Sequence, residues 1–145
     1  MTKFTNKKGG FTLIELLVVI GIIAILAAIV IVSINPAKRF QDARQSQRQA
    51  NVESILNAIQ QSVVDNEGEI CSEITTTVQD ISNTEADLKS CLADYLAVLP
   101  TDPQDATGDV TTATYNTGYE VVKNAQGQVT VSAPGSEDGT ISVTR

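Results

Sequence analysis

The chain has 145 residues, a length typical of one domain, and carries 10 basic against 17 acidic residues, for a formal net charge of −7. It contains no His and no Trp. Without His, the chain cannot form a Ser-His or Cys-His nucleophile pair or offer an imidazole ligand to zinc or haem. The negative charge repels nucleic acid unless basic groups gather on one face, so no nucleic-acid partner is expected.

The Ile and Leu residues are concentrated near the N-terminus. Leu16–Ile34 is an uncharged run of 19 residues. As a helix it would extend about 28 Å, close to the hydrocarbon thickness of a bilayer of about 30 Å. The run therefore predicts a transmembrane helix. The polar remainder of the chain has room for only a small core.

A short basic segment precedes this run and ends in Gly9-Gly10, just before Phe11. We interpret residues 1–10 as a targeting leader. An ordinary secretory signal has an apolar stretch of about 7–15 residues and is cut after it. Here the small residues come first, so a cut after Gly10 would release the leader and leave the membrane helix on the mature chain.

Residues 7–20, Lys-Lys-Gly-Gly-Phe-Thr-Leu-Ile-Glu-Leu-Leu-Val-Val-Ile, resemble the class III signal of type IV pilins and type II secretion pseudopilins. The shared features are a Gly before the cut, a Phe after it, a Glu four residues further on, and an unbroken apolar helix. The resemblance implies cleavage after Gly10 by a prepilin peptidase, N-methylation of Phe11, and assembly into a helical filament.

The resemblance also implies partners and locations. Before assembly the chain would lie in the cytoplasmic membrane, surrounded by lipid, with one membrane pass and a cytoplasmic N-terminus. Afterwards it would be part of a cell-surface filament. The implied partners are the prepilin peptidase and methyltransferase, the assembly machinery of a pilus or secretion system, and further copies of the chain.

Glu15 is an acidic residue within an apolar helix, where burial of a carboxylate is unfavourable. After cleavage Phe11 carries a free amine, and Phe11 and Glu15 stand four residues apart on one helix face. Glu15 either complements the N-terminus of its own helix or, as the resemblance implies, pairs with the Phe11 amine of an adjacent subunit. The second interpretation, in which Glu15 sets the axial register of the filament, is the one we favour.

Asn35-Pro36 interrupts the helix, because Pro lacks an N–H and disfavours helical geometry in the residue before it. Beyond it, apolar residues recur every three or four positions, as in an amphipathic helix that ends near Asn66. We expect one long helix from Phe11 to about Asp65, with a kink or restart at Pro36. Its parts would be a filament-core segment, 11–35, and an amphipathic segment, 36–66.

Four basic residues follow the apolar run: Lys38, Arg39, Arg44 and Arg48. Such a cluster could bind nucleic acid or anionic lipid. It is interleaved with Gln and Asp, however, and Phe40 is its only aromatic neighbour. A solvated helix face, or a basic helix that meets acidic head domains in a filament, fits this pattern better.

The segment 69–99 connects the long helix to the rest of the head, residues 36–145. Ser82-x-x-Glu85 resembles a capping box, and Leu residues repeat at helical spacing, which predicts a helix from about Thr84 to Ala97. Cys71 and Cys91 are the only cysteines. If the head is exported, a disulfide is the simplest interpretation and would contribute around 3 kcal/mol. The alternative is two buried thiols.

Leu99-Pro100-Thr101-Asp102-Pro103 resembles the element that precedes the head sheet in major pseudopilins and in many minimal bacterial pilins. In pseudopilins a loop in this neighbourhood binds calcium, and the candidate ligands here are Asp102, Asp105 and Asp109. Carboxylate oxygens suit calcium. Asp residues are also common in turns, which is the alternative interpretation.

The C-terminal region, 115–145, alternates apolar and polar residues. This period predicts a three-stranded antiparallel sheet with strands at Tyr119–Lys123, Gln128–Ser132 and Ile141–Thr144. One face of the sheet would pack on the helix stripe of Ile55, Ile59 and Val63. The expected fold is α+β and pilin-like, with a long N-terminal helix against a small sheet.

The sequence therefore predicts a structural filament subunit, the substrate of processing enzymes and not itself an enzyme. The function we favour is the subunit of a type IV pilus. One alternative is a pseudopilin of a type II secretion system. The other is a single-pass membrane-anchored enzyme, which the absence of His leaves with little support.

Overall fold

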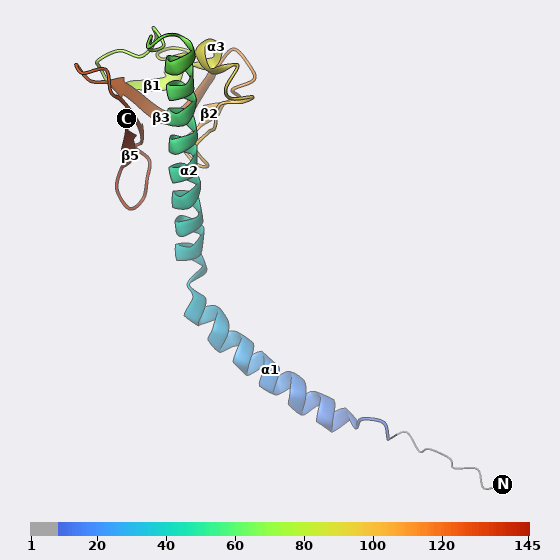
Figure 1. The fold of residues 1–145 in the computed structure, drawn as a ribbon. Coiled ribbons are helices and arrows are strands. Elements are labelled where there is room, and N and C mark those ends of the chain that lie inside the picture. Colours follow the sequence, from blue (N-terminus) through green and yellow to red (C-terminus); the bar gives the residue numbers. More distant parts are fainter. Residues whose placement is uncertain (1–8) are drawn as a thin grey trace, which may run out of the picture. The chain divides into compact units, whose positions relative to one another are not determined.

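A computed structural model describes residues 9–145 (Figure 1). Most of the predicted leader, residues 1–8, lies outside the described residues. The chain divides into two compact units, one that reaches to Arg39 and one that comprises Phe40–Arg145. The second unit lies within the predicted head, residues 36–145, and has its own hydrophobic core.

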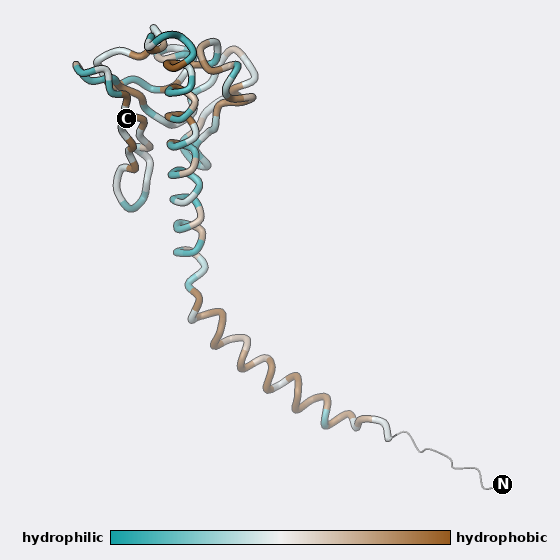
Figure 2. The backbone as a smooth tube through the Cα atoms, viewed as in Figure 1, coloured by the Kyte–Doolittle hydropathy of each residue, from teal (hydrophilic) through white to brown (hydrophobic). Residues whose placement is uncertain are grey.

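Helix α1, Leu13–Ile34, is the apolar helix predicted from the sequence. Thr12 caps its N-terminus, and none of its residues is buried. Its 22 residues correspond to about 33 Å, enough to cross the hydrocarbon core of a bilayer. Figure 2 shows hydrophobic residues along its whole length. It is the one helix in the described part of the chain that is long and apolar enough to span a membrane.

A single residue separates α1 from α2, Pro36–Asp65. Asn35 adopts a left-handed conformation with φ 46° and ψ 79°, which Asn tolerates better than most residues because its short polar side chain can bond locally. The predicted restart at Pro36 is therefore a new helix. At the other end of α2, Gly68 has a φ of 99°, and its N–H donates to the carbonyl of Val63 at 2.7 Å, closing the last turn.

The head contains an antiparallel sheet of five strands: β1 (Gln79–Ser82), β2 (Thr107–Gly108), β3 (Tyr115–Lys123), β4 (Val129–Ala133) and β5 (Ile141–Thr144). The spatial order is β1-β3-β4-β5, and β2 also pairs with β3. The three predicted strands correspond to β3, β4 and β5. The prediction of only three was incomplete, because β1 and β2 are short, largely polar segments that depend on pairing with β3.

The core of the head lies between α2 and one face of the sheet. Side chains of β3 alternate between buried and half-buried positions along most of the strand. Its buried apolar residues join those of β4 and α2 in one cluster, which includes Val52, Ile55, Leu56, Ile59, Tyr119, Val121, Val129 and Val131. Val63 is half-buried against this cluster. The predicted packing of a sheet on one stripe of the helix is confirmed.

Helix α3, Lys89–Leu92, has four residues, so the prediction of a helix over Thr84–Ala97 was too long. The capping-box residues serve another purpose. Ser82 is the last residue of β1, and its hydroxyl accepts from the N–H of Glu85 at 3.3 Å. The Glu85 carboxylate accepts from the N–H of Asp80 at 2.7 Å. Both side chains therefore stabilise a turn at the end of β1 and begin no helix.

Candidate functional site

The predicted cleavage site precedes α1 in non-helical, exposed chain. Gly9 and Gly10 are exposed, and no other group lies within 4 Å of the place where a Cβ on Gly10 would be. Phe11 is 86% exposed. A peptidase could approach this backbone from any side, because neither side chains nor tertiary contacts cover it.

Glu15 forms a capping box with Thr12 at the N-terminus of α1. The Thr12 backbone N–H and hydroxyl both donate to Glu15 Oε2 at 2.7 Å, and the Glu15 N–H donates to Thr12 Oγ1 at 3.3 Å. The chain described here retains Gly10, so Phe11 contributes a peptide nitrogen and no free amine. In this uncleaved chain the side chains of Glu15 and Thr12 therefore satisfy two backbone N–H groups at the start of the helix.

The apolar side chains of α1 have no partner within the described part of the chain. Every large apolar residue from Phe11 to Ile34 is at least 49% exposed. A helix that is apolar all round is stable in lipid or in the interior of a larger assembly, because a continuous apolar surface of this size is unfavourable in water. This surface therefore needs lipid or other protein to cover it.

Arg48 occupies a buried position in the head that the sequence did not reveal, because a solvated face was expected for its basic cluster. The side chains of Arg48 and Asp102 are both 0% exposed. Arg48 Nε donates to Asp102 Oδ2 at 2.6 Å, and Nη2 donates to Oδ1 at 3.1 Å. Nη2 also donates to Gln104 Oε1 at 3.2 Å and lies 3.6 Å from Asp105 Oδ2.

Asp102 anchors the loop before β2 through this ion pair. Its carboxylate Oδ1 also accepts from the N–H groups of Gln104 and Asp105, at 2.8 and 2.9 Å. Burial raises the pKa of Asp102, but the hydrogen bonds from Arg48 and from these N–H groups outweigh it and hold the pKa below the ordinary 3.8. A Cβ on Gly118, whose φ is 78°, would stand 2.8 Å from the Asp102 Cβ, so β3 needs a glycine where it passes this loop.

Two of the candidate calcium ligands, Asp102 and Asp109, accept hydrogen bonds from protein groups. Asp102 is committed to Arg48, and Asp109 Oδ1 instead accepts from the N–H and hydroxyl of Thr111, at 2.8 and 2.7 Å. In residues 9–145, no group of three or more His, Cys, Asp or Glu is arranged to hold a metal ion. The alternative interpretation, in which these Asp residues stabilise turns, accounts for Asp102 and Asp109.

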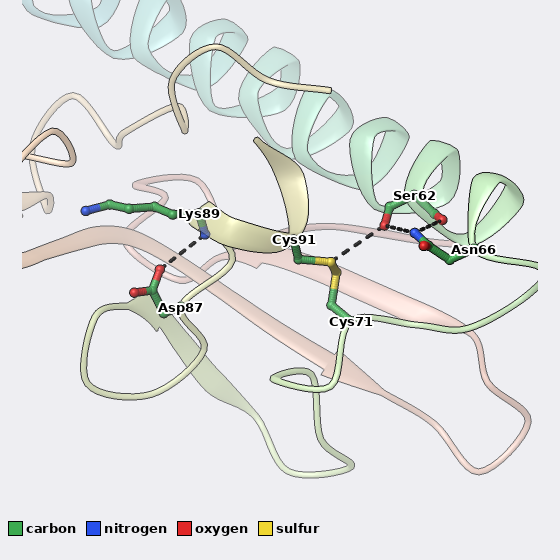
Figure 3. The surroundings of a disulfide bond; sticks show 6 residues. All are labelled: Ser62, Asn66, Cys71, Asp87, Lys89 and Cys91. Carbon is green, nitrogen blue, oxygen red and sulfur yellow. Dashed lines mark hydrogen bonds between the residues drawn. A yellow bond between two sulfur atoms is a disulfide. The ribbon is translucent and has the colours of Figure 1, made fainter. Parts of the chain in front are cut away.

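The structure contains the predicted disulfide between Cys71 and Cys91, with a Cα–Cα distance of 6.0 Å (Figure 3). It joins the segment after α2 to α3, across 20 residues of chain. Ser62 Oγ of α2 lies 3.6 Å from Cys91 Sγ, and Asn66 donates to the Ser62 carbonyl at 2.8 Å. The disulfide therefore holds the short α3 beside the last turn of α2.

We expect reduction of Cys71–Cys91 to lower the free energy of unfolding of the head by about 3 kcal/mol, because the unfolded chain gains the freedom of the opened loop. The measurement is the melting temperature of the chain in detergent, with and without reductant. A Cys71→Ala, Cys91→Ala double variant is the control and should not respond to reductant. Alkylation of either cysteine in denatured, unreduced protein would contradict the disulfide.

Residues 5–31 match the prokaryotic N-terminal methylation motif, the class III prepilin signal of type IV pilins and pseudopilins. The match includes Gly10, Phe11 and Glu15. The motif supports a type IV pilin-like or pseudopilin precursor and points to a structural class of protein. Processing by a prepilin peptidase and assembly into a pilus-like system are implied by the same motif. No curated protein and no solved structure gives a significant match to the chain.

Proposed function

We propose that this chain is the subunit of a type IV pilus filament. It is made as a prepilin in the cytoplasmic membrane with its N-terminus inside, cleaved after Gly10, N-methylated at Phe11 and assembled into a helical fibre on the cell surface. The observation that carries the proposal is α1: an exposed apolar helix that directly follows the accessible Gly10-Phe11 site of the methylation motif.

The apolar surface of α1 has to be covered both in the membrane and in the assembled filament. In the membrane, lipid covers all its faces, because Glu15 is the only charged residue among its 22 residues. In a filament, copies of the same helix replace lipid and exclude water equally well. The head needs neither environment, because its core is internal and its disulfide suits an oxidising compartment. The proposed parts are therefore a leader, 1–10, a filament-core helix, 11–35, and a head, 36–145.

A second candidate is a pseudopilin of a type II secretion system. The element Leu99–Pro103 is compatible with it, because the resemblance of this element extends to major pseudopilins as well as to many minimal bacterial pilins. The two candidates differ in where the assembly ends. A pilus extends from the cell surface, whereas a pseudopilus moves cargo across the outer membrane.

The test is a deletion strain complemented with the wild-type gene at native expression. Electron micrographs and a sheared-fibre fraction should show surface fibres that contain this chain and vanish with the deletion. The N-terminal residue of the sheared protein should be methylated Phe11, read by mass spectrometry. Normal surface fibres in the deletion strain, combined with loss of a secreted protein, would favour the pseudopilin instead.

Gly10→Leu should leave the full-length precursor in the membrane, because a large side chain at this position obstructs entry of the extended backbone into a protease cleft. Gly10→Ala, which adds one methyl group in open space, is the matched control and should still be processed. Intact mass of the membrane fraction distinguishes precursor from mature chain. A mature N-terminus at Phe11 in the Leu variant would show that cleavage does not require a small residue at position 10, and a mature N-terminus elsewhere would contradict the assigned cleavage position.

A further inference from the structure

Phe40 is an exposed aromatic residue on the polar first part of α2. It is 66% exposed, whereas Tyr115 and Tyr119 of the head are buried. The residues beside it in sequence are Arg39 and Gln41, and none of the buried core residues lies this early in the helix. A large apolar side chain in this position contributes nothing to the core of its own subunit.

The head also contains an apolar pocket that its own residues leave open. The cavity has a volume of about 230 Å³ and lies between α3 and the segments on either side of the Leu99–Pro103 element. Its apolar lining includes Leu92, Leu96, Val98, Leu99 and Val110. An apolar cavity of about 150 Å³ already accommodates a benzene molecule, so the phenyl ring of a Phe fits in this pocket.

The charges beside the two features are complementary. Lys38 and Arg39 directly precede Phe40, and both are exposed. Asp109 is exposed next to the pocket residues Val110 and Thr111. Lys89, the one basic residue in the pocket wall, donates from its ammonium to the Thr112 carbonyl at 2.6 Å and lies 4.0 Å from the centre of the Tyr115 ring.

We propose that Phe40 of one subunit inserts into this pocket on a neighbouring copy of the same chain, with Lys38 and Arg39 near Asp109 at the edge of the pocket. Phe40 is not among the residues that line the pocket of its own head. The contact joins two different surfaces, the exposed Phe40 side chain of one subunit and the pocket of the next, so it is heterologous. Repeated heterologous contacts that do not close into a ring generate a helical filament. The inference rests on the proposed filament function and names a contact within it.

The first test replaces Phe40 with the photo-crosslinking amino acid p-benzoylphenylalanine in the full chain, expressed in the native host. Irradiated fibres should yield an adduct between residue 40 and the tryptic fragment Ser90–Lys123, which contains the pocket residues from Leu92 to Val110. Fragmentation should place the attachment between residues 92 and 111. Adducts elsewhere in the head, or with lipid only, would overturn the proposal.

The second test compares two exposed valines. Val98→Glu places a charge at the pocket, and Val78→Glu is the matched control, since the two side chains are 56% and 61% exposed and only Val98 lines the pocket. Phe40→Ala and Val98→Glu should each reduce the fibre-bound fraction about tenfold or more, as expected for loss of one buried apolar side chain. Val78→Glu should assemble like the wild type.

The outcomes separate this contact from the function on which it rests. Melting temperatures within a few degrees of the wild type would show that the variants fold. Wild-type fibre yields from both Phe40→Ala and Val98→Glu would refute the contact and leave the pilus proposal intact. A wild-type chain that forms no fibre would refute the proposed function and this contact with it.

Discussion

Asp102→Asn should lower the free energy of unfolding by about 3 kcal/mol or more, because it leaves the Arg48 guanidinium buried without its carboxylate. The substitution keeps an oxygen that can accept from the N–H groups of Gln104 and Asp105. The loop geometry is thus preserved, and the decrease in the free energy of unfolding comes mainly from breaking the ion pair. The measurement is urea unfolding of the chain in detergent, followed by circular dichroism.

Two further variants make the result specific. Asp138→Asn removes an exposed carboxylate from the head and should change the free energy of unfolding by no more than about 0.5 kcal/mol. Combining Asp102→Asn with Arg48→Met should recover part of the loss, because an apolar side chain does not carry the desolvation penalty of an unpaired buried cation. Equal small losses from Asp102→Asn and Asp138→Asn would mean that the ion pair contributes no stability.

The same pair gives the head a defined response to acid. The pKa of Asp102 is below its ordinary value of 3.8 in the folded head, so the folded state prefers the charged form. The stabilisation from this group is therefore complete above the unfolded pKa and is lost as the pH falls through the lower folded pKa. The wild type should lose its stability advantage over Asp102→Asn below about pH 4. An advantage that is unchanged at pH 2 would contradict the assigned shift.

The features that the sequence revealed are those determined by short stretches of chain. A run without charges identified α1, period-two alternation identified β3, β4 and β5, and Asn35-Pro36 identified the helix break. Each of these patterns lies within about 20 residues, where local geometry and burial determine the structure. The disulfide was also within reach, because the chain offers only one pair of cysteines.

The missed features depend on residues that are distant in the chain. Arg48 and Asp102 are 54 positions apart, and nothing near either residue indicates that they meet. Ser82 and Glu85 matched a helix-start pattern, yet pairing of β1 with β3 places them in a turn. Asp102, a candidate calcium ligand, is a further example, since its carboxylate pairs with Arg48 of α2.

Glu15 gives the prediction with the largest expected effect on function, and the capping box makes a sharp experiment possible. Glu15→Ala removes both the charge and the hydrogen bonds to Thr12. Glu15→Gln removes only the charge, since Gln serves a capping box as well as Glu does. If Glu15 acts solely as a cap, the Gln variant should assemble normally. If it pairs with the free Phe11 amine of an adjacent subunit, both variants should fail to assemble.

We expect both variants to lose most of the sheared-fibre fraction. Insertion in the membrane should be unaffected, because removal of a carboxylate makes the segment easier to place in lipid. In the filament interior, the substitution leaves the Phe11 ammonium of every subunit without a counter-charge where water is excluded, and this deficit recurs at each subunit. Wild-type and variant chains would be expressed at equal levels, and the fibre and membrane fractions compared. Normal fibre yield from Glu15→Gln would show that Glu15 only caps its own helix. Other contacts would then set the axial register of the subunits.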